Sequence, residues 1–214
     1  MWNGNFNDAE QQMFDLIPAN TICPLVMTVR PGGKGDGGWF RESNNTDAMM
    51  LDCEFTVSDG PYARRKLWKL FVLSGGKTDE NGNSIAANIS RATLRAILES
   101  ARGINPTDFS ENAKKARTVK GPEDFNGLEF VGKIGIEKGQ NGYADKNTLL
   151  MVITPEKKEY QEVKKGNFAQ PAQAPPQPSG QANTPPWAGG ATQAPNDQPA
   201  QSQQKTSTIP SWAQ

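Results

Sequence analysis

The stretch that decides the fold is DGPYARRKLWKLFVL, residues 59–73. Gly60 and Pro61 supply the free and the fixed φ of a tight turn, and the residues from Leu67 onward are bulky strand formers without a helical period. Alternation divides the strand into two faces, with Lys66, Trp68, Leu70 and Val72 on one and Leu67, Lys69, Phe71 and Leu73 on the other. The stretch predicts a turn that leads into a strand rich in cations and aromatic rings.

Two interpretations of these rings and cations are open. Flat rings that stack on bases, set among cations that meet phosphates, are typical of a single-stranded nucleic-acid site. Alternatively, Trp68 and Phe71 belong to the core, and Arg64, Arg65 and Lys66 form a solvated turn. The rest of the chain has to decide between them.

Charge is unevenly distributed along this chain of 214 residues, which is neutral overall. Residues 1–59 carry 3 Lys or Arg against 9 Asp or Glu, whereas residues 60–120 carry 12 against 5, a local balance of +7. Such a basic segment can guide a polyanion even though the sequence pI is near 6.4. The charge pattern therefore favours a nucleic-acid partner for the middle of the chain.

The end of the chain differs from the rest in composition. Residues 167–214 are mainly Pro, Gln, Ala, Ser, Thr and Gly, and such a segment cannot bury enough apolar surface to offset its chain entropy. We expect one domain over residues 1–166 and a disordered tail over residues 167–214. Trp187 and Trp212, each next to alanine and near proline, are predicted docking points for partner proteins, or else incidental to a low-complexity tract.

Apolar alternation predicts five strands, over residues 21–30, 49–58, 67–73, 130–137 and 149–153. In the last strand, Leu149, Met151 and Ile153 are expected to point inward. One helix is predicted from Ser84 to Arg102, with these residues inward: Ile85, Ile89, Leu94, Ile97, Leu98 and Ala101. The predicted class is mainly β, with the element order of an OB-fold-like five-stranded antiparallel barrel and one helix between strands three and four.

A glycine-rich segment follows the first predicted strand. Residues 31–38 contain five glycines and lead directly into Trp39 and Phe40. We expect a flexible hairpin tip that exposes both rings for stacking on bases. The alternative is that the rings fold back onto the barrel and only the glycines are loose.

Several classes of function are disfavoured by what the sequence lacks. There is no histidine, and Cys23 and Cys53 have no metal-ligand or redox spacing, so we expect reduced core thiols, no metal, no cofactor and no enzyme. The first residues are acidic rather than basic and apolar, and the longest purely apolar run, residues 149–153, is too short to span a bilayer. We expect a cytoplasmic protein that does not contact a membrane.

Five short motifs resemble a family of phage-encoded single-stranded DNA-binding proteins. The matching residues are IPANT at 17–21, LDCEFTVSDG at 51–60, YARRKLW at 62–68, FNGL at 125–128 and KN at 146–147. The resemblance covers residues 16–155. It implies a non-enzymatic, OB-fold-like module that acts in phage DNA replication or recombination in the host cytoplasm.

The predicted function is sequence-tolerant binding of single-stranded DNA. The rings expected to stack on bases are Trp39, Phe40, Tyr62, Trp68 and Tyr143. The cations expected along the backbone path are Arg64, Arg65, Lys66, Lys69, Lys77, Lys133 and Lys146. Replication or recombination proteins are expected as partners of the tail. The alternative is a non-enzymatic interaction adaptor whose Trp-bearing tail recruits partners, with DNA binding incidental.

Overall fold

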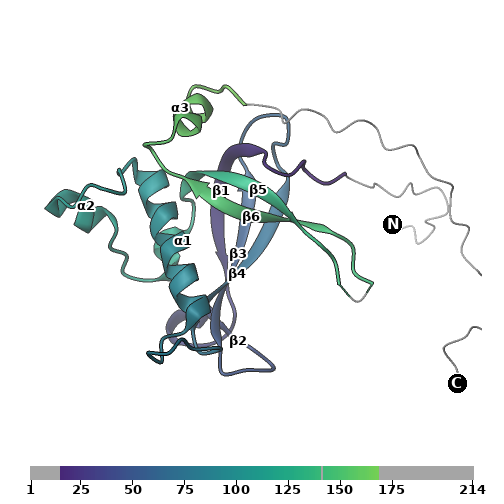
Figure 1. The fold of residues 1–214 in the computed structure, drawn as a ribbon, viewed down its shortest axis with the longest axis vertical. Coiled ribbons are helices and arrows are strands. Elements are labelled where there is room, and N and C mark those ends of the chain that lie inside the picture. The colour runs from purple at the N-terminus through teal and green to yellow at the C-terminus, as the bar shows by residue number, and fades with distance from the viewer. Residues whose placement is uncertain (1–14, 141, 169–214) are drawn as a thin grey trace, which may run out of the picture. The chain divides into compact units, whose positions relative to one another are not determined.

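Six antiparallel strands dominate residues 15–140 and 142–168, which are the residues that the computed structural model describes (Figure 1). The strands are β1 (Ile22–Arg30), β2 (Phe40–Glu42), β3 (Met49–Val57), β4 (Lys66–Ser74), β5 (Glu129–Glu137) and β6 (Lys146–Ile153). The helices are α1 (Ile85–Arg102), α2 (Glu111–Ala116) and α3 (Lys158–Lys164), with short 3-10 turns η1 (Asp36–Gly38) and η2 (Pro122–Phe125). The prediction of a mainly β protein is confirmed.

Strand β1 lies at the centre of the sheet. It pairs with β3 on one edge and with β5 on the other, β4 forms a hairpin with β3, and β6 forms a hairpin with β5. On one edge, β3 pairs with β4 along nearly its whole length. On the other edge, β1 pairs with residues 52–57 of β3, and the short β2 pairs with residues 49–51. The residues that we expected to form strands do so, and the number of strands is six because β2 adds to the five predicted.

The two ends of the sheet, β4 and β6, approach each other without a backbone ladder between them in the described part of the chain. Lys69 on β4 spans this seam, since its Nζ donates a hydrogen bond to the carbonyl oxygen of Leu149 at 3.1 Å. The sheet is therefore open at this seam, with a lysine side chain where a closed barrel has strand pairing.

The core lies between the inner face of the sheet and α1. Phe55 contacts Phe71 and Phe130 edge to face, with ring centroids 6.3 and 5.6 Å apart. Cys23 and Cys53 are buried and form no disulfide, as predicted. Burial raises the pKa of the Cys23 thiol to about 12 and raises that of Cys53 as well, so both stay protonated at neutral pH.

Helix α1 has the predicted ends. The Ser84 hydroxyl accepts a hydrogen bond from the backbone N–H of Ala87 at 3.2 Å, and Gly103 takes the left-handed conformation with φ of 66°. The prediction of which α1 residues point inward was partly wrong, because Ile85 and Ile89 are 47% and 64% exposed. At about 100° per residue, Ile85 lies opposite the buried Leu94 around the helix, so both cannot face the core.

Strand β6 departs from strict alternation. Lys133 on β5 pairs with Met151, but the next β5 residue, Ile134, pairs with Leu149, which leaves Leu150 as an extra residue. This bulge turns Met151 outward, and its exposed fraction is 44%. The prediction that Met151 points inward was wrong because a bulge cannot be read from alternation.

A second, smaller core lies on the other face of β5. Val131 is buried there with Ile153, Tyr160 and Val163, the last two from α3. Ile153, which we expected to point inward with Leu149, packs in this second core because the bulge reverses the facing of the residues that follow it. The hydroxyl of Tyr160 donates to the carbonyl oxygen of Ser100 at 2.8 Å, which ties α3 to α1.

The chain continues past α3 to Phe168, which packs on this second core. Its ring lies close enough to Gly60 that a Cβ there would touch it. The rest of the predicted tail, including Trp187 and Trp212, lies outside the described residues.

None of the described helices has the length and apolar character needed to cross a bilayer.

Candidate nucleic-acid interface

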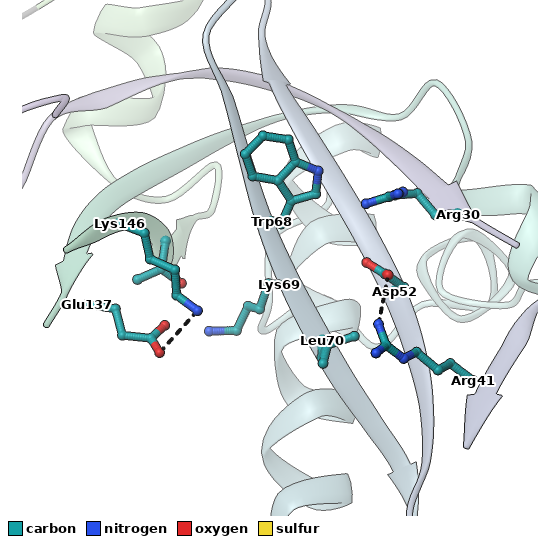
Figure 2. Close-up of a pocket in the computed structure, with 9 residues that line it drawn as sticks. Arg30, Arg41, Asp52, Trp68, Lys69, Leu70, Glu137 and Lys146 are labelled. Atoms are coloured by element: carbon teal, nitrogen blue, oxygen red, sulfur yellow. Dashed lines mark ion pairs between the residues drawn. The ribbon is translucent and has the colours of Figure 1, made fainter. Parts of the chain in front are cut away.

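A groove of about 490 Å³ opens on the outer face of the sheet, opposite the core (Figure 2). Its walls come from strands β1 to β4 and from the two strands of the β5–β6 hairpin. The residues that line it are Arg30, Arg41, Asp52, Trp68, Lys69, Leu70, Glu137, Lys146 and Thr148.

The β3–β4 register determines which side chains reach the groove. Glu54 pairs with Trp68 and Asp52 with Leu70, whereas Leu51 pairs with Phe71. Paired residues point to the same face of a sheet, and neighbours along a strand point to opposite faces. Trp68 is accordingly 48% exposed in the groove and Phe71 is 1% exposed in the core. Leu70 shares the face of Trp68, as the alternation predicts, and is 43% exposed in the groove.

The indole of Trp68 is held at one edge. Its Nε1 donates a hydrogen bond to Glu54 Oε2 at 3.2 Å, while Lys66 Nζ lies 2.6 Å from Glu54 Oε1. The hydrogen bond from Lys66, and less strongly that from Trp68, lowers the pKa of the Glu54 carboxyl below its usual range. Glu54 is thus an ionised acceptor at neutral pH that fixes both neighbours.

Cations outnumber acids in the groove. Arg30, Arg41, Lys69 and Lys146 line it together with Asp52 and Glu137, which leaves a local balance of +2. Figure 2 shows two ion pairs on opposite sides of β4. Arg41 lies 3.5 Å from Asp52, and Lys146 lies 3.3 Å from Glu137.

Lys69 differs from the other groove cations because it is half-buried. Desolvation lowers the pKa of its ammonium group, and the nearby Glu137 carboxylate partly opposes that effect. Since its Nζ already donates to the carbonyl of Leu149, Lys69 connects the two sides of the groove floor.

The structure brings together four of the residues predicted for the site. Trp68, Lys69 and Lys146 line the groove, and Lys66 lies beside it through its contact with Glu54. Tyr143 is 81% exposed near the tip of the β5–β6 hairpin, in a second hollow that shares Glu137 and Lys146 with the groove.

Trp39 and Phe40 do not form exposed rings on a mobile tip. Both are partly buried and pack against the core. The backbone of Phe40 exchanges two hydrogen bonds with that of Lys34, at 2.9 and 3.0 Å. Gly35, with φ of 69°, lies so close to the Phe40 ring that a Cβ would overlap it. The expectation of exposure was therefore wrong, and the folded-back alternative matches the structure.

The remaining predicted residues lie outside the groove. Tyr62 is partly buried against the core, and Arg64 is exposed on the β3–β4 turn with φ of 69°. Arg65 donates to the carbonyl oxygen of Asp15 at 2.6 Å. Lys77 is exposed in the loop after β4, and Lys133 is half-buried on β5.

Sequence reasoning did not assign several groove residues. Arg30 and Asp52 could have been found, since each alternates with the apolar residues of its strand and so belongs to the opposite face. Arg41 carried no such signal, because β2 has only three residues and its place depends on pairing with β3.

Among the described residues, no group of three or more His, Cys, Asp or Glu side chains is placed to hold a metal ion.

The chain matches no model of a known protein family and no curated protein sequence. The resemblance to phage single-stranded DNA-binding proteins thus stays a prediction, and the groove has to be interpreted from its own chemistry.

Proposed function

We propose that this protein is an OB-fold-like, sequence-tolerant single-stranded DNA-binding protein whose DNA lies in the groove over β3 and β4. The observation that carries the proposal is the half-exposed ring of Trp68, held at its edge in a groove that Arg30, Arg41 and Lys146 also line. A π-face among cations suits the two parts of a nucleotide, the base and the phosphate.

The strand order supports this proposal. If β2 is counted with the loop that follows β1, the order is three strands, a helix and two strands, with β1 between β3 and β5. OB-folds are partly open barrels that bind oligonucleotides over the second and third strands, between the loops that join strands one to two and four to five. Here those positions hold β3 and β4, Arg41 of β2, and the β5–β6 hairpin with Lys146.

Binding would combine stacking with exchange of ion pairs. Stacking of one base on Trp68 is worth roughly 1–3 kcal/mol. Phosphates would compete with Asp52 for Arg41 and with Glu137 for Lys146, two pairs whose cations are 51% and 65% exposed. A duplex keeps its base faces stacked inside, so it could use the cations but not the ring.

The resemblance extends the proposal to a biological role in phage DNA replication or recombination, in the host cytoplasm. Binding of this kind needs no catalytic group, and the proposal assigns none.

Titration of the protein with single-stranded DNA, duplex DNA and RNA at low salt tests the proposal. Tryptophan fluorescence should be quenched by the single strand, and a Trp68→Phe variant should lose most of the quenching while still binding. Affinity should fall with salt, with a log-log slope of about −0.7 for each phosphate neutralised. Unchanged fluorescence together with unchanged mobility of labelled single strands at low salt would refute the proposal.

A further inference from the structure

We propose that Asp52 makes this groove prefer bases that carry an exocyclic amino group over thymine. The inference rests on the proposed function and deepens it by naming the bases that the site accepts best. The Asp52 carboxylate stands in the middle of a surface otherwise suited to a polyanion.

Asp52 occupies the centre of the groove. Its ladder partners are Arg30 on β1 and Leu70 on β4, and all three line the groove. The next row along the sheet holds Glu54 and Trp68. Rows on one face of a sheet are roughly 6.6 Å apart, so a base stacked on Trp68 can direct its edge toward Asp52.

The surroundings of Asp52 match the edge of cytosine. A carboxylate only accepts hydrogen bonds, and the exocyclic N4 amino group of cytosine donates them. Arginine only donates, and Arg41 Nη1 lies 3.5 Å from Asp52 Oδ2. An acceptor next to a donor is complementary to cytosine, where the amino group is followed by the N3 and O2 acceptors. Thymine in the same position puts the acceptor O4 where cytosine has its amino group, and O4 would face the carboxylate unfavourably. The N3–H donor of thymine would reach Asp52 only if the base shifted along its edge, away from the position that stacks best on Trp68.

Adenine and guanine also carry exocyclic amino groups, so the structure assigns to Asp52 discrimination against thymine rather than selection of one base. The site stays tolerant of most sequences. In the structure Arg41 orients the Asp52 carboxylate, and the Asp52 side chain is 18% exposed to the groove.

A simpler role for Asp52 would be that of a counterion for Arg41. In that case the carboxylate repels phosphates, which weakens the binding of every oligonucleotide by the same factor. The two roles can be separated by varying the base, because repulsion between Asp52 and the phosphates does not depend on which base is bound.

The test compares two oligonucleotides that differ only in the relevant edge. Homopolymers of 5-methyldeoxycytidine and of thymidine, equal in length, share the ring size and the 5-methyl group. Binding of labelled strands to the full chain is followed by fluorescence anisotropy at neutral pH and low salt. We expect the 5-methylcytosine strand to bind about fivefold more tightly.

Two variants assign the effect to Asp52. Asp52→Asn should bring the two affinities within about twofold of each other, because an amide offers a donor to O4 as well as an acceptor to N4. Glu111→Gln makes the same change of charge on α2, at a carboxylate that pairs with Lys114, and should keep the preference.

The failures are distinguishable. If neither strand binds, the proposed function is wrong and this inference with it. If the wild-type protein binds both strands equally, the proposed function stands and the inference is overturned, whatever the variant does. If Asp52→Asn keeps the wild-type preference, the assignment to Asp52 is overturned.

Discussion

The groove and the segment that follows α1 are both rich in cations, and they use them differently. In the groove, Arg41 and Lys146 are mostly exposed and form ion pairs at 3.5 and 3.3 Å. Helix α2 lies behind α1, on the side away from the strands (Figure 1). Arg117, which follows α2, is 12% exposed and lies 2.6 Å from the buried Glu99. A cation with such a partner is part of the fold and is not available to DNA.

The segment over residues 103–121 is held to α1 by arginines. Arg117 also donates to the carbonyl oxygens of Asp108 and Asn105, at 2.6 and 3.0 Å. Arg102 donates to the carbonyl of Ala116 at 2.6 Å. The charge of +7 over residues 60–120 is therefore divided between a surface that can meet a ligand and a contact that organises the chain.

Removing Glu99 should produce the largest effect. Glu99→Ala leaves the guanidinium of Arg117 mostly buried without a carboxylate, which should cost about 3 kcal/mol of unfolding free energy. Urea denaturation measures the loss. The matched control is Glu111→Ala, which breaks an exposed pair with Lys114 and should cost less than about 0.5 kcal/mol. Equal losses would show that Glu99 has no special role in the fold.

Trp68→Ala should have the next largest effect, on binding rather than on stability. Loss of one stacked base should weaken single-stranded DNA binding about tenfold or more. Because the ring is 48% exposed, the melting temperature should change little. Phe71→Ala is the opposite case on the same strand and should destabilise the fold by about 3 kcal/mol. A large loss of stability in Trp68→Ala would favour a core role for Trp68.

A pair of arginine substitutions should sharpen the comparison further. Arg41→Gln should weaken DNA binding about threefold to fivefold and make the log-log salt slope shallower by about 0.7. Arg102→Gln removes the same charge at the end of α1, where the side chain bonds to the segment over residues 103–121. It should leave the salt slope unchanged and lower the free energy of unfolding by about 1 kcal/mol. A shallower slope in Arg102→Gln would mean that DNA also reaches the back of α1.

The smallest effect is expected from deleting residues 169–214. Affinity for single-stranded DNA should stay within about threefold, since the groove residues all precede the deletion. Capture of replication or recombination proteins, measured by pull-down with each chain length, should be lost. DNA binding that disappears with the tail would favour the interaction adaptor.

Much of the fold could be predicted from short-range patterns. Alternation over β3 and β4, the turn at Gly60 and the ends of α1 at Ser84 and Gly103 all depend on residues close together in the chain. The inward facing of Leu94 also followed from the helical period. The prediction for Ile85 was wrong because only a narrow face of α1 contacts the core. The prediction for Met151 was wrong because a bulge in β6 interrupts the alternation of its side chains.

The candidate site was only partly predictable. Trp68, Lys66, Lys69 and Lys146 were named from residue type, but Arg30 and Arg41 join them through pairing between strands far apart in sequence. Trp39 and Phe40 were named for the same reason as Trp68, yet they pack against the core. A ring is equally able to stack on a base or to fill a core, so its type does not decide its place.

The sequence by itself determined the mainly β class, the hairpin over residues 49–74 and the concentration of positive charge in the middle of the chain. These properties depend on composition and on neighbours along the backbone. Only the tertiary structure decided which cations are exposed and which are paired, as the contrast between Arg41 and Arg117 shows. The physical reason is that burial and ion pairing depend on distances between segments, and those distances follow from strand register and helix packing.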